Sequence, residues 1–171
     1  DITTSYGYPT INSNTFDKWI AIQGTISGKS GIANGQTAHH ILGTVTVDPT
    51  ASLAFSQPGQ VVKFRSDGSL YATGVLKAEG DLSSKIVFTS QNDADYGGSG
   101  ATPSSWGRIY CEGAGSDNSL LKNVEVRYGG NAVMRVSSYG HYASVVLMSS
   151  GATLENVQIK NSPTWFYSPG T

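Results

Sequence analysis

The fold is decided by residues 41–90, which read ILGTVTVDPTASLAFSQPGQVVKFRSDGSLYATGVLKAEGDLSSKIVFTS. Apolar and polar residues alternate in the short runs, as at Val45 and Val47 between threonines, which predicts half-buried β-strands. Strands this short cannot each bury a core alone, so we expect them to coil or stack. Residue pairs typical of turns separate the runs: Asp48-Pro49, Pro58-Gly59, Asp67-Gly68 and Gly80-Asp81.

The same interpretation extends along the chain. Gly74 interrupts residues 69–80, which predicts two short strands about a bend. The longest expected loop is residues 91–105, QNDADYGGSGATPSS, which has no apolar face and is expected to lie outside the core, before strands resume at Trp106. No window of helix length is amphipathic, which excludes α/β and doubly wound folds.

One pattern occurs twice, 33 residues apart, in residues 121–127 (LKNVEVR) and 154–160 (LENVQIK). Successive coils must present the same inward residues at the same height, so the repeat predicts stacked rungs. The leucines and the aliphatic residues would point inward and the charged residues outward. Asn123 and Asn156 occupy matching positions and are expected to stack as an amide ladder at a turn.

The composition limits the classes of partner. Only 13% of the 171 residues are charged, against about 25% in ordinary soluble proteins. A net charge of −1 gives no basic face for nucleic acid, and no segment approaches the ~20 apolar residues of a membrane span. Cys111 is the single cysteine, expected as a buried core thiol, with an intermolecular bridge as the alternative. Because the chain opens on Asp1, we expect a mature form or an excised fragment.

Residues 58–130 carry a series of motifs in a fixed order: Pro58-Gly59, V-V-K-F at 61–64, G-x-L-x-x-x-G-x-L-x-A-x-G at 68–80, I-V-F-T-S at 86–90, W-G-x-I at 106–109 and L-x-N-V-x-V-x-Y-G-G at 121–130. This series resembles the right-handed parallel β-helix repeats common in large secreted and surface proteins of bacteria. The resemblance implies the fold, because the shared residues are core and turn residues. Members of that family are mostly adhesins, surface-layer components and modules beside polysaccharide-active domains, which implies an extracellular or cell-surface location.

The expected fold is therefore all-β, a short right-handed parallel β-helix (β-solenoid) with three parts. Residues 1–38 are expected to form an N-terminal cap or arm with one or two strands, and GKSGIANGQT (residues 28–37) a glycine- and asparagine-rich loop. Residues 39–162 are expected to form the rungs, and residues 163–171 an aromatic tail.

Catalytic residues are not assigned. A polysaccharide lyase or hydrolase fragment is a minor alternative, but lyases need clustered carboxylates for Ca²⁺ and hydrolases need paired carboxylates on one face. Asp93 and Asp95 are a close pair of carboxylates in a loop. They are a weak candidate for a Ca²⁺ site, the only cofactor considered, and solvated turn carboxylates are the favoured interpretation.

Two non-enzymatic functions are predicted. The first is a structural subunit that assembles head to tail into a filament or surface layer, because short solenoids with weak caps expose strand edges. Its expected interface is Trp19, Ile20, Ile22, Val157, Ile159, Trp165, Phe166 and Tyr167. The second is an adhesin or carbohydrate-binding module that presents its loops to a polysaccharide, with Tyr139, His141 and Tyr142 as candidates.

Overall fold

The computed structural model describes residues 2–4, 10–11, 20–32, 40–131, 133–136, 139–163 and 166–167. These residues form an all-β structure in which the only helices are two short 3₁₀ turns, η1 (Ala94–Tyr96) and η2 (Ala114–Ser116). The expected all-β class is confirmed.

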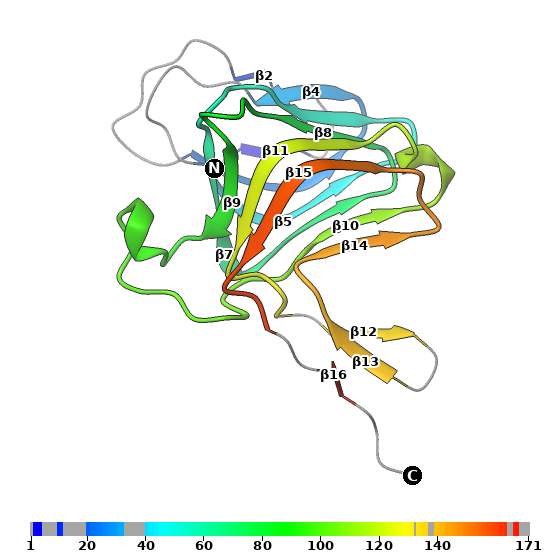
Figure 1. Cartoon of the computed structure of the whole chain (residues 1–171). Helices are drawn as coiled ribbons and strands as arrows, with labels where there is room; N and C mark the ends of the chain where they lie inside the picture. The colour runs from blue at the N-terminus through cyan, green and yellow to red at the C-terminus, as the bar shows by residue number, and fades with distance from the viewer. Residues whose placement is uncertain are drawn as a thin grey trace.

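Thirteen of the described strands form one parallel, nearly closed sheet around a single interior (Figure 1). Every pairing in this sheet is parallel and joins residues that lie at least 20 positions apart in the sequence. The strands are β1 (Ile2–Thr4), β2 (Thr10–Ile11), β3 (Ile20–Ile26), β4 (Lys29–Ile32), β5 (His40–Val47), β6 (Ser52–Phe55), β7 (Val61–Ala72), β8 (Val75–Glu79), β9 (Ile86–Ser90), β10 (Ile109–Glu112), β11 (Leu120–Arg127), β14 (Val145–Met148) and β15 (Thr153–Lys160).

The pairings sort this sheet into three faces that the chain visits in the same order. The first face contains residues 2–4, 20–22, 40–42, 61–64, 86–90, 124–127 and 157–160. The second contains residues 24–26, 44–47, 69–72, 109–112 and 145–148. The third contains residues 10–11, 29–32, 52–55, 75–79, 120–122 and 153–155. We call one passage over the three faces a circuit.

The core is a column of apolar side chains, and successive circuits contribute them from matching positions in the strand register. On the third face, Phe55, Ala78 and Leu121 are in register and buried. On the first face the register joins Val62, Phe88 and Val126, which are also buried. Alternate residues of each strand supply this column, which is why the period-two pattern is visible in the sequence.

The expected repeat is confirmed residue by residue. Strands β11 and β15 pair in parallel with Leu121 opposite Leu154 and Val126 opposite Ile159. Gly74 separates β7 from β8, as expected, because a Cβ atom there would approach the Asp48 carbonyl oxygen to 2.0 Å. The predicted burial of the Cys111 thiol is also confirmed, and burial raises its pKa to about 11.

The boundary expected at residue 39 is wrong. β3 and β4 already pair with β5 and β6 in the same parallel sheet, so circuits include residues 20–32. Lys29–Ile32 is a strand within the segment predicted as a loop. The strand pattern in the sequence is weak here, because Ile32 is the one large apolar residue of the segment. Pairing with neighbouring strands stabilises β4 in spite of this composition.

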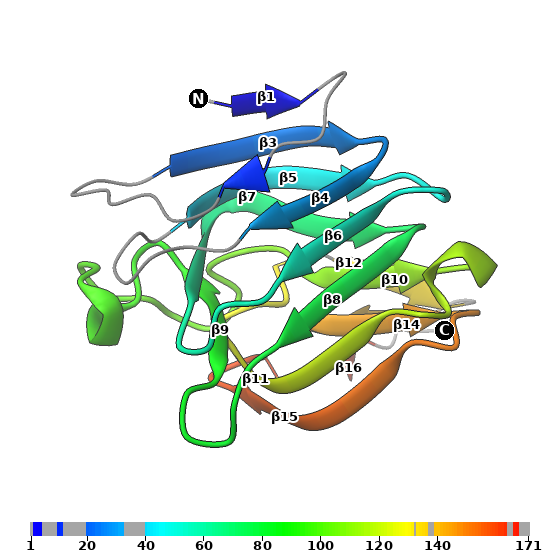
Figure 2. The same ribbon diagram turned by 90° about the horizontal axis from the view of Figure 1, so that it is seen from above.

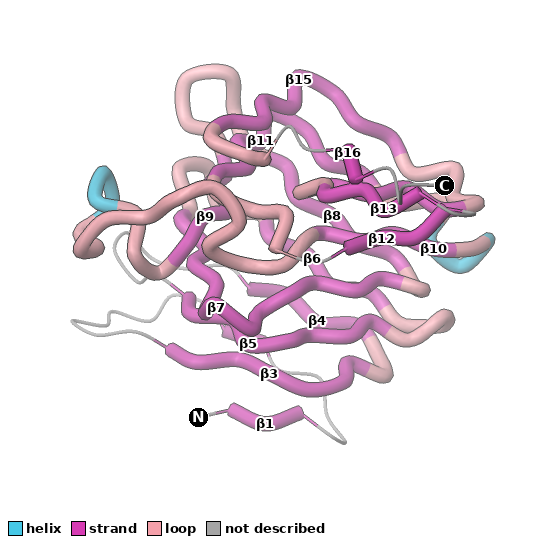
Figure 3. The backbone as a smooth tube through the Cα atoms, turned by 90° about the horizontal axis from the view of Figure 1, so that it is seen from below, coloured by secondary structure: helices cyan, strands magenta, loops and turns pink. Residues whose placement is uncertain are grey.

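Two insertions leave the circuits. Residues 91–108 connect the first face to the second and carry η1 on the outer side of β7 and β9 (Figure 1). Residues 128–144 contain β12 (Val133–Val136) and β13 (Tyr139–Tyr142), which form a separate three-stranded antiparallel sheet with β16 (Phe166–Tyr167). Part of the expected tail is therefore a strand of this small sheet (Figure 3), which lies to one side of the main sheet (Figure 1).

Candidate functional site

The clearest candidate site is the end of the main sheet formed by β14 and β15, which we call the C-terminal end (Figure 2). β14 pairs only with β10 and β15 only with β11, so each keeps one edge without a strand partner in the described part of the chain. Backbone N–H and C=O groups on such an edge are a template for another strand.

Apolar side chains cover the same end. Leu147, Leu154 and Ile159 are 38%, 42% and 51% exposed, although each is in register with a buried residue of the preceding circuit. Val145 and Val157 lie between them, partly buried. The core column therefore continues into the last circuit, and none of the described strands of the main sheet lies beyond that circuit. We call these five residues the terminal apolar layer.

The opposite end of the sheet is different. Ile22, Ile26 and Ile32, the apolar residues of the circuit formed by β3 and β4, are at most 1% exposed. β1 pairs outside β3 and β2 pairs outside β4 (Figure 2). The first complete apolar layer is thus covered, and the last is not.

The structure separates the residues that the sequence predicted as an assembly interface. Val157 and Ile159 lie in the terminal apolar layer, as that prediction requires. Ile22 is a correction: it is buried beneath β1 and cannot line an interface.

The other predicted interface residues lie elsewhere. Ile20 begins β3, and Phe166 and Tyr167 form β16 on the small antiparallel sheet. Trp19 and Trp165 lie outside the described residues. Leu147 and Leu154 were missed, although Leu154 belongs to the sequence repeat.

The predicted amide ladder is present at the corner between the third face and the first. The Asn156 amide donates to Asn123 Oδ1 at 2.8 Å, and the Asn123 amide donates to the Gly80 carbonyl oxygen at 2.8 Å. Both asparagines have positive φ, 51° and 52°, a conformation that asparagine adopts more easily than other side chains. The ladder therefore fixes the corner where β11 passes from β8 to β9.

A charged cluster lies on the outer side of the first face, around Arg127. Its guanidinium pairs with Asp93 at 2.8 Å and with Glu125 at 3.0 Å, and it also binds Asp95. Asp93 is fully buried and accepts a 2.6 Å hydrogen bond from the Thr89 hydroxyl. Tyr96 places its ring 5.5 Å from the guanidinium carbon. The cluster thereby holds residues 93–96 of the long loop against the sheet.

Further contacts complete this cluster. Lys63 is fully buried, and its ammonium donates to the Tyr96 carbonyl oxygen. Burial lowers the pKa of Lys63, and the charge of Asp93 opposes that effect. Burial alone would lower the pKa of Arg127 too, but hydrogen bonds to Glu125 and Asp95 and the charge of Asp93 raise it. The cations of this cluster thus serve to anchor the loop.

This burial corrects two expectations from the sequence. Asp93 is not a solvated turn carboxylate, because it is buried against the Arg127 guanidinium. Lys63 and Arg127 alternate with inward residues as predicted, but the loop covers them and they do not reach solvent. The sequence held one signal that could have predicted this contact: the loop carries the acidic Asp93 and Asp95, and the strand carries the basic Arg127.

The cluster predicts how stability depends on pH. Burial would raise the pKa of Glu125, but hydrogen bonds from Lys160 (2.7 Å) and Arg127 outweigh it and lower that pKa. A carboxylate with a lowered pKa stabilises the fold above the unfolded value, about 4.3, and loses that contribution as the pH falls through the folded value. We expect urea unfolding to show wild type more stable than Glu125→Gln at neutral pH, with a difference that shrinks below about pH 4. A difference that stayed constant with pH would contradict this role.

The Ca²⁺ candidate has a different occupant in the structure. The carboxylates of Asp93 and Asp95 do lie together, but the cation between them is the Arg127 guanidinium. Within the described ranges no three His, Cys, Asp or Glu side chains are grouped as a metal site would require. The close carboxylates of this cluster thus bind a guanidinium, and the sequence prediction of Ca²⁺ gains no geometric support.

The three carbohydrate-binding candidates belong to one strand. Tyr139, His141 and Tyr142 all lie in β13, which pairs antiparallel with β12 and β16. The candidates thus belong to the small sheet, and their role in binding a polysaccharide stays a prediction.

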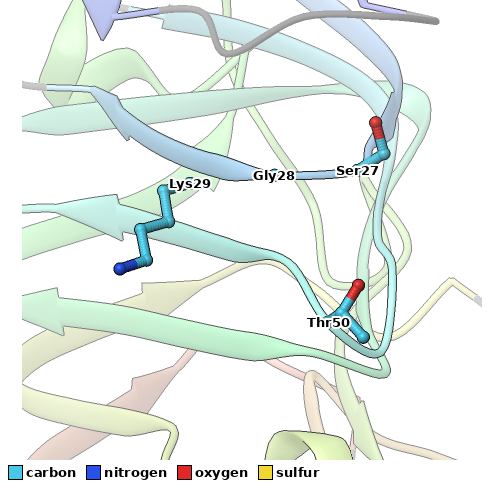
Figure 4. A pocket seen from close by; sticks show the side chains of 4 residues that line it. All are labelled: Ser27, Gly28, Lys29 and Thr50. Carbon is cyan, nitrogen blue, oxygen red and sulfur yellow. The ribbon is translucent and has the colours of Figure 1, made fainter.

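A shallow hollow opens between successive turns of the main sheet, at Ser27, Gly28, Lys29 and Thr50 (Figure 4). Ser27 and Thr50 contribute hydroxyls, and Lys29 contributes a single cation. None of the residues predicted from the sequence lines it. The hollow holds no pair of acid and base groups that could carry out a reaction.

Comparison with family models, with curated proteins and with solved structures found no match for this chain. Among the residues that the structure describes, there is no helix with the length and apolar character needed to cross a membrane. The case for a function therefore depends on the geometry of the C-terminal end.

Proposed function

We propose that the chain is a non-enzymatic structural protein, a right-handed parallel β-helix that assembles end to end with other copies. The observation that carries this proposal is the terminal apolar layer, which lies on two strands that each keep an unpaired edge. Strand addition there would satisfy the backbone groups and bury the apolar side chains in the same step.

The pairing of β11 with β15 supports this mode of contact. Leu121 covers Leu154 on one side, and the Lys122 ammonium reaches Glu155 at 2.8 Å across the same two strands. An incoming strand with similar spacing would repeat these contacts on the other side of β15. Parallel strands lie about 4.8 Å apart, so one added layer is enough to cover Leu154 and Ile159.

A contact between the N-terminal end of one copy and the C-terminal end of another does not form a closed dimer. Such heterologous contacts generate open filaments, because each added copy presents a new C-terminal end. We propose a filament or surface layer as the product. An extracellular or cell-surface location is part of this proposal and is supported by the low fraction of charged residues, 13%.

The test is the double substitution Leu154→Lys and Ile159→Lys. Both side chains are about half exposed in the single chain, so lysine fits there without disturbing the fold, but stacking would bury its charge. We expect wild type to form particles whose mass rises with concentration, and the variant to associate at least about 100-fold more weakly. Sedimentation velocity and negative-stain electron microscopy at micromolar concentrations measure this.

Leu82→Lys is the matched control. Leu82 is also an exposed leucine (79%), but it lies in the turn between β8 and β9 and is not part of the terminal apolar layer. The control should assemble like wild type, and circular dichroism should show the same β-sheet signal in all three proteins. A wild type that remains monomeric at every concentration would overturn the proposed function.

A further inference from the structure

The amide ladder has a direction that the backbone fixes. It begins at the Gly80 carbonyl oxygen, which can only accept a hydrogen bond, so Asn123 must turn its N–H toward Gly80. Asn123 Oδ1 then faces the next circuit and accepts the Asn156 amide. A Cβ atom on Gly80 would lie 2.6 Å from the Asn123 carbonyl oxygen, so the ladder starts on a residue that must be glycine.

The same logic sets what the ladder presents at the C-terminal end. Asn156 has turned its amide toward Asn123, so its Oδ1 faces away from the sheet. No side chain or backbone donor in the described part of the chain binds this oxygen, and the residue is exposed. The end of the ladder is therefore a hydrogen-bond acceptor, located between Leu154 and Ile159 on the edge strand β15.

We propose that Asn156 Oδ1 selects the partner of the C-terminal end, a strand of a second copy that carries a side-chain N–H donor at this corner. This inference rests on the proposed function and adds a polar requirement to an otherwise apolar contact. A buried acceptor without a donor costs about 1–3 kcal/mol, so a purely apolar strand is disfavoured.

The ladder also sets the orientation of the second copy. A two-fold contact that paired Asn156 of one copy with Asn156 of the other would bring two Oδ1 acceptors together, and no hydrogen bond would form between them. An N-terminal end avoids this conflict. Head-to-tail stacking is thus favoured over a closed dimer.

The test compares Asn156→Gly with Asn161→Gly. Both asparagines have positive φ, 52° and 53°, so glycine preserves either backbone, but only Asn156 belongs to the ladder. We expect the association constant, measured by sedimentation equilibrium, to fall about tenfold for Asn156→Gly and to stay unchanged for Asn161→Gly. If wild type assembles and Asn156→Gly assembles equally well, the ladder proposal is overturned while the proposed function stands.

A peptide experiment separates the two proposals if wild type does not assemble. The probe is a fluorescent peptide with the sequence of β11, LLKNVEVR, which already pairs in parallel with β15 on its other side. Fluorescence anisotropy should show tighter binding than for the same peptide with glycine in place of its asparagine. With a monomeric wild type the proposed function fails, and a preference for the asparagine peptide would still support the ladder. Equal binding of both peptides, or none, would overturn it.

Discussion

Arg127→Ala is expected to destabilise the protein by about 3–5 kcal/mol, because the substitution removes the ion-pair partner of a buried carboxylate. Asp93 is fully buried, and it would keep only the Thr89 hydroxyl and the charge of the buried Lys63 in place of the 2.8 Å contact with the guanidinium. The same change removes the anchor of residues 93–96, so we expect faster proteolysis in the loop 91–105. Chemical denaturation and limited proteolysis measure the two effects.

Arg65→Ala is the matched control for this prediction. Arg65 also pairs with an aspartate two residues away, Asp67, at 3.1 Å, but both side chains are about half exposed or more. Exposed ion pairs contribute about 0–1 kcal/mol, so this variant should unfold nearly like wild type. Equal stabilities of the Arg127 and Arg65 variants would show that the Arg127 cluster does not hold the loop.

Trp106→Ala is expected to cost about 3–5 kcal/mol, the range for removal of a buried tryptophan. The Trp106 ring is fully buried and stacks on Phe64 with centroids 4.0 Å apart and planes 6° from parallel. Its indole N–H donates to the Arg127 carbonyl oxygen at 2.7 Å. One side chain thus joins the core to the strand that carries the charged cluster.

Trp106→Phe separates the two contributions. Phenylalanine retains a stacked ring on Phe64 but cannot donate to the Arg127 carbonyl, so we expect a smaller loss, about 1–2 kcal/mol. Urea unfolding monitored by far-ultraviolet circular dichroism compares the three proteins. If Trp106→Ala lost less than Trp106→Phe, the stacking role assigned to this ring would be wrong.

The sequence predicted the parts of the fold that depend on local periodicity. Val45 and Val47 point inward, as their alternation with threonines predicted, and the 33-residue repeat predicted the register of β11 with β15. The ladder of Asn123 and Asn156 followed from the same repeat. Each of these features is repeated at a fixed spacing, so one chain contains enough information to reveal it.

The remaining features depend on contacts between segments without a common pattern. Lys63 and Arg127 look like ordinary solvated strand residues, and only the position of the loop 91–105 makes them buried. The exposure of Leu147 and Leu154 depends on which circuit is the last, and a period cannot show that. Strand β4 was missed because its partners, and not its own residues, determine it.

The stacking of circuits has a consequence for how the molecule unfolds. Each circuit touches only its neighbours, so the free energy of folding is approximately a sum of nearest-neighbour terms, as in other one-dimensional arrays. β15 has a neighbour on one side only, whereas β7 lies between circuits on both sides. Fraying is therefore expected to begin at terminal strands such as β15, which lose contact with one neighbour only, and the centre of the array opens last.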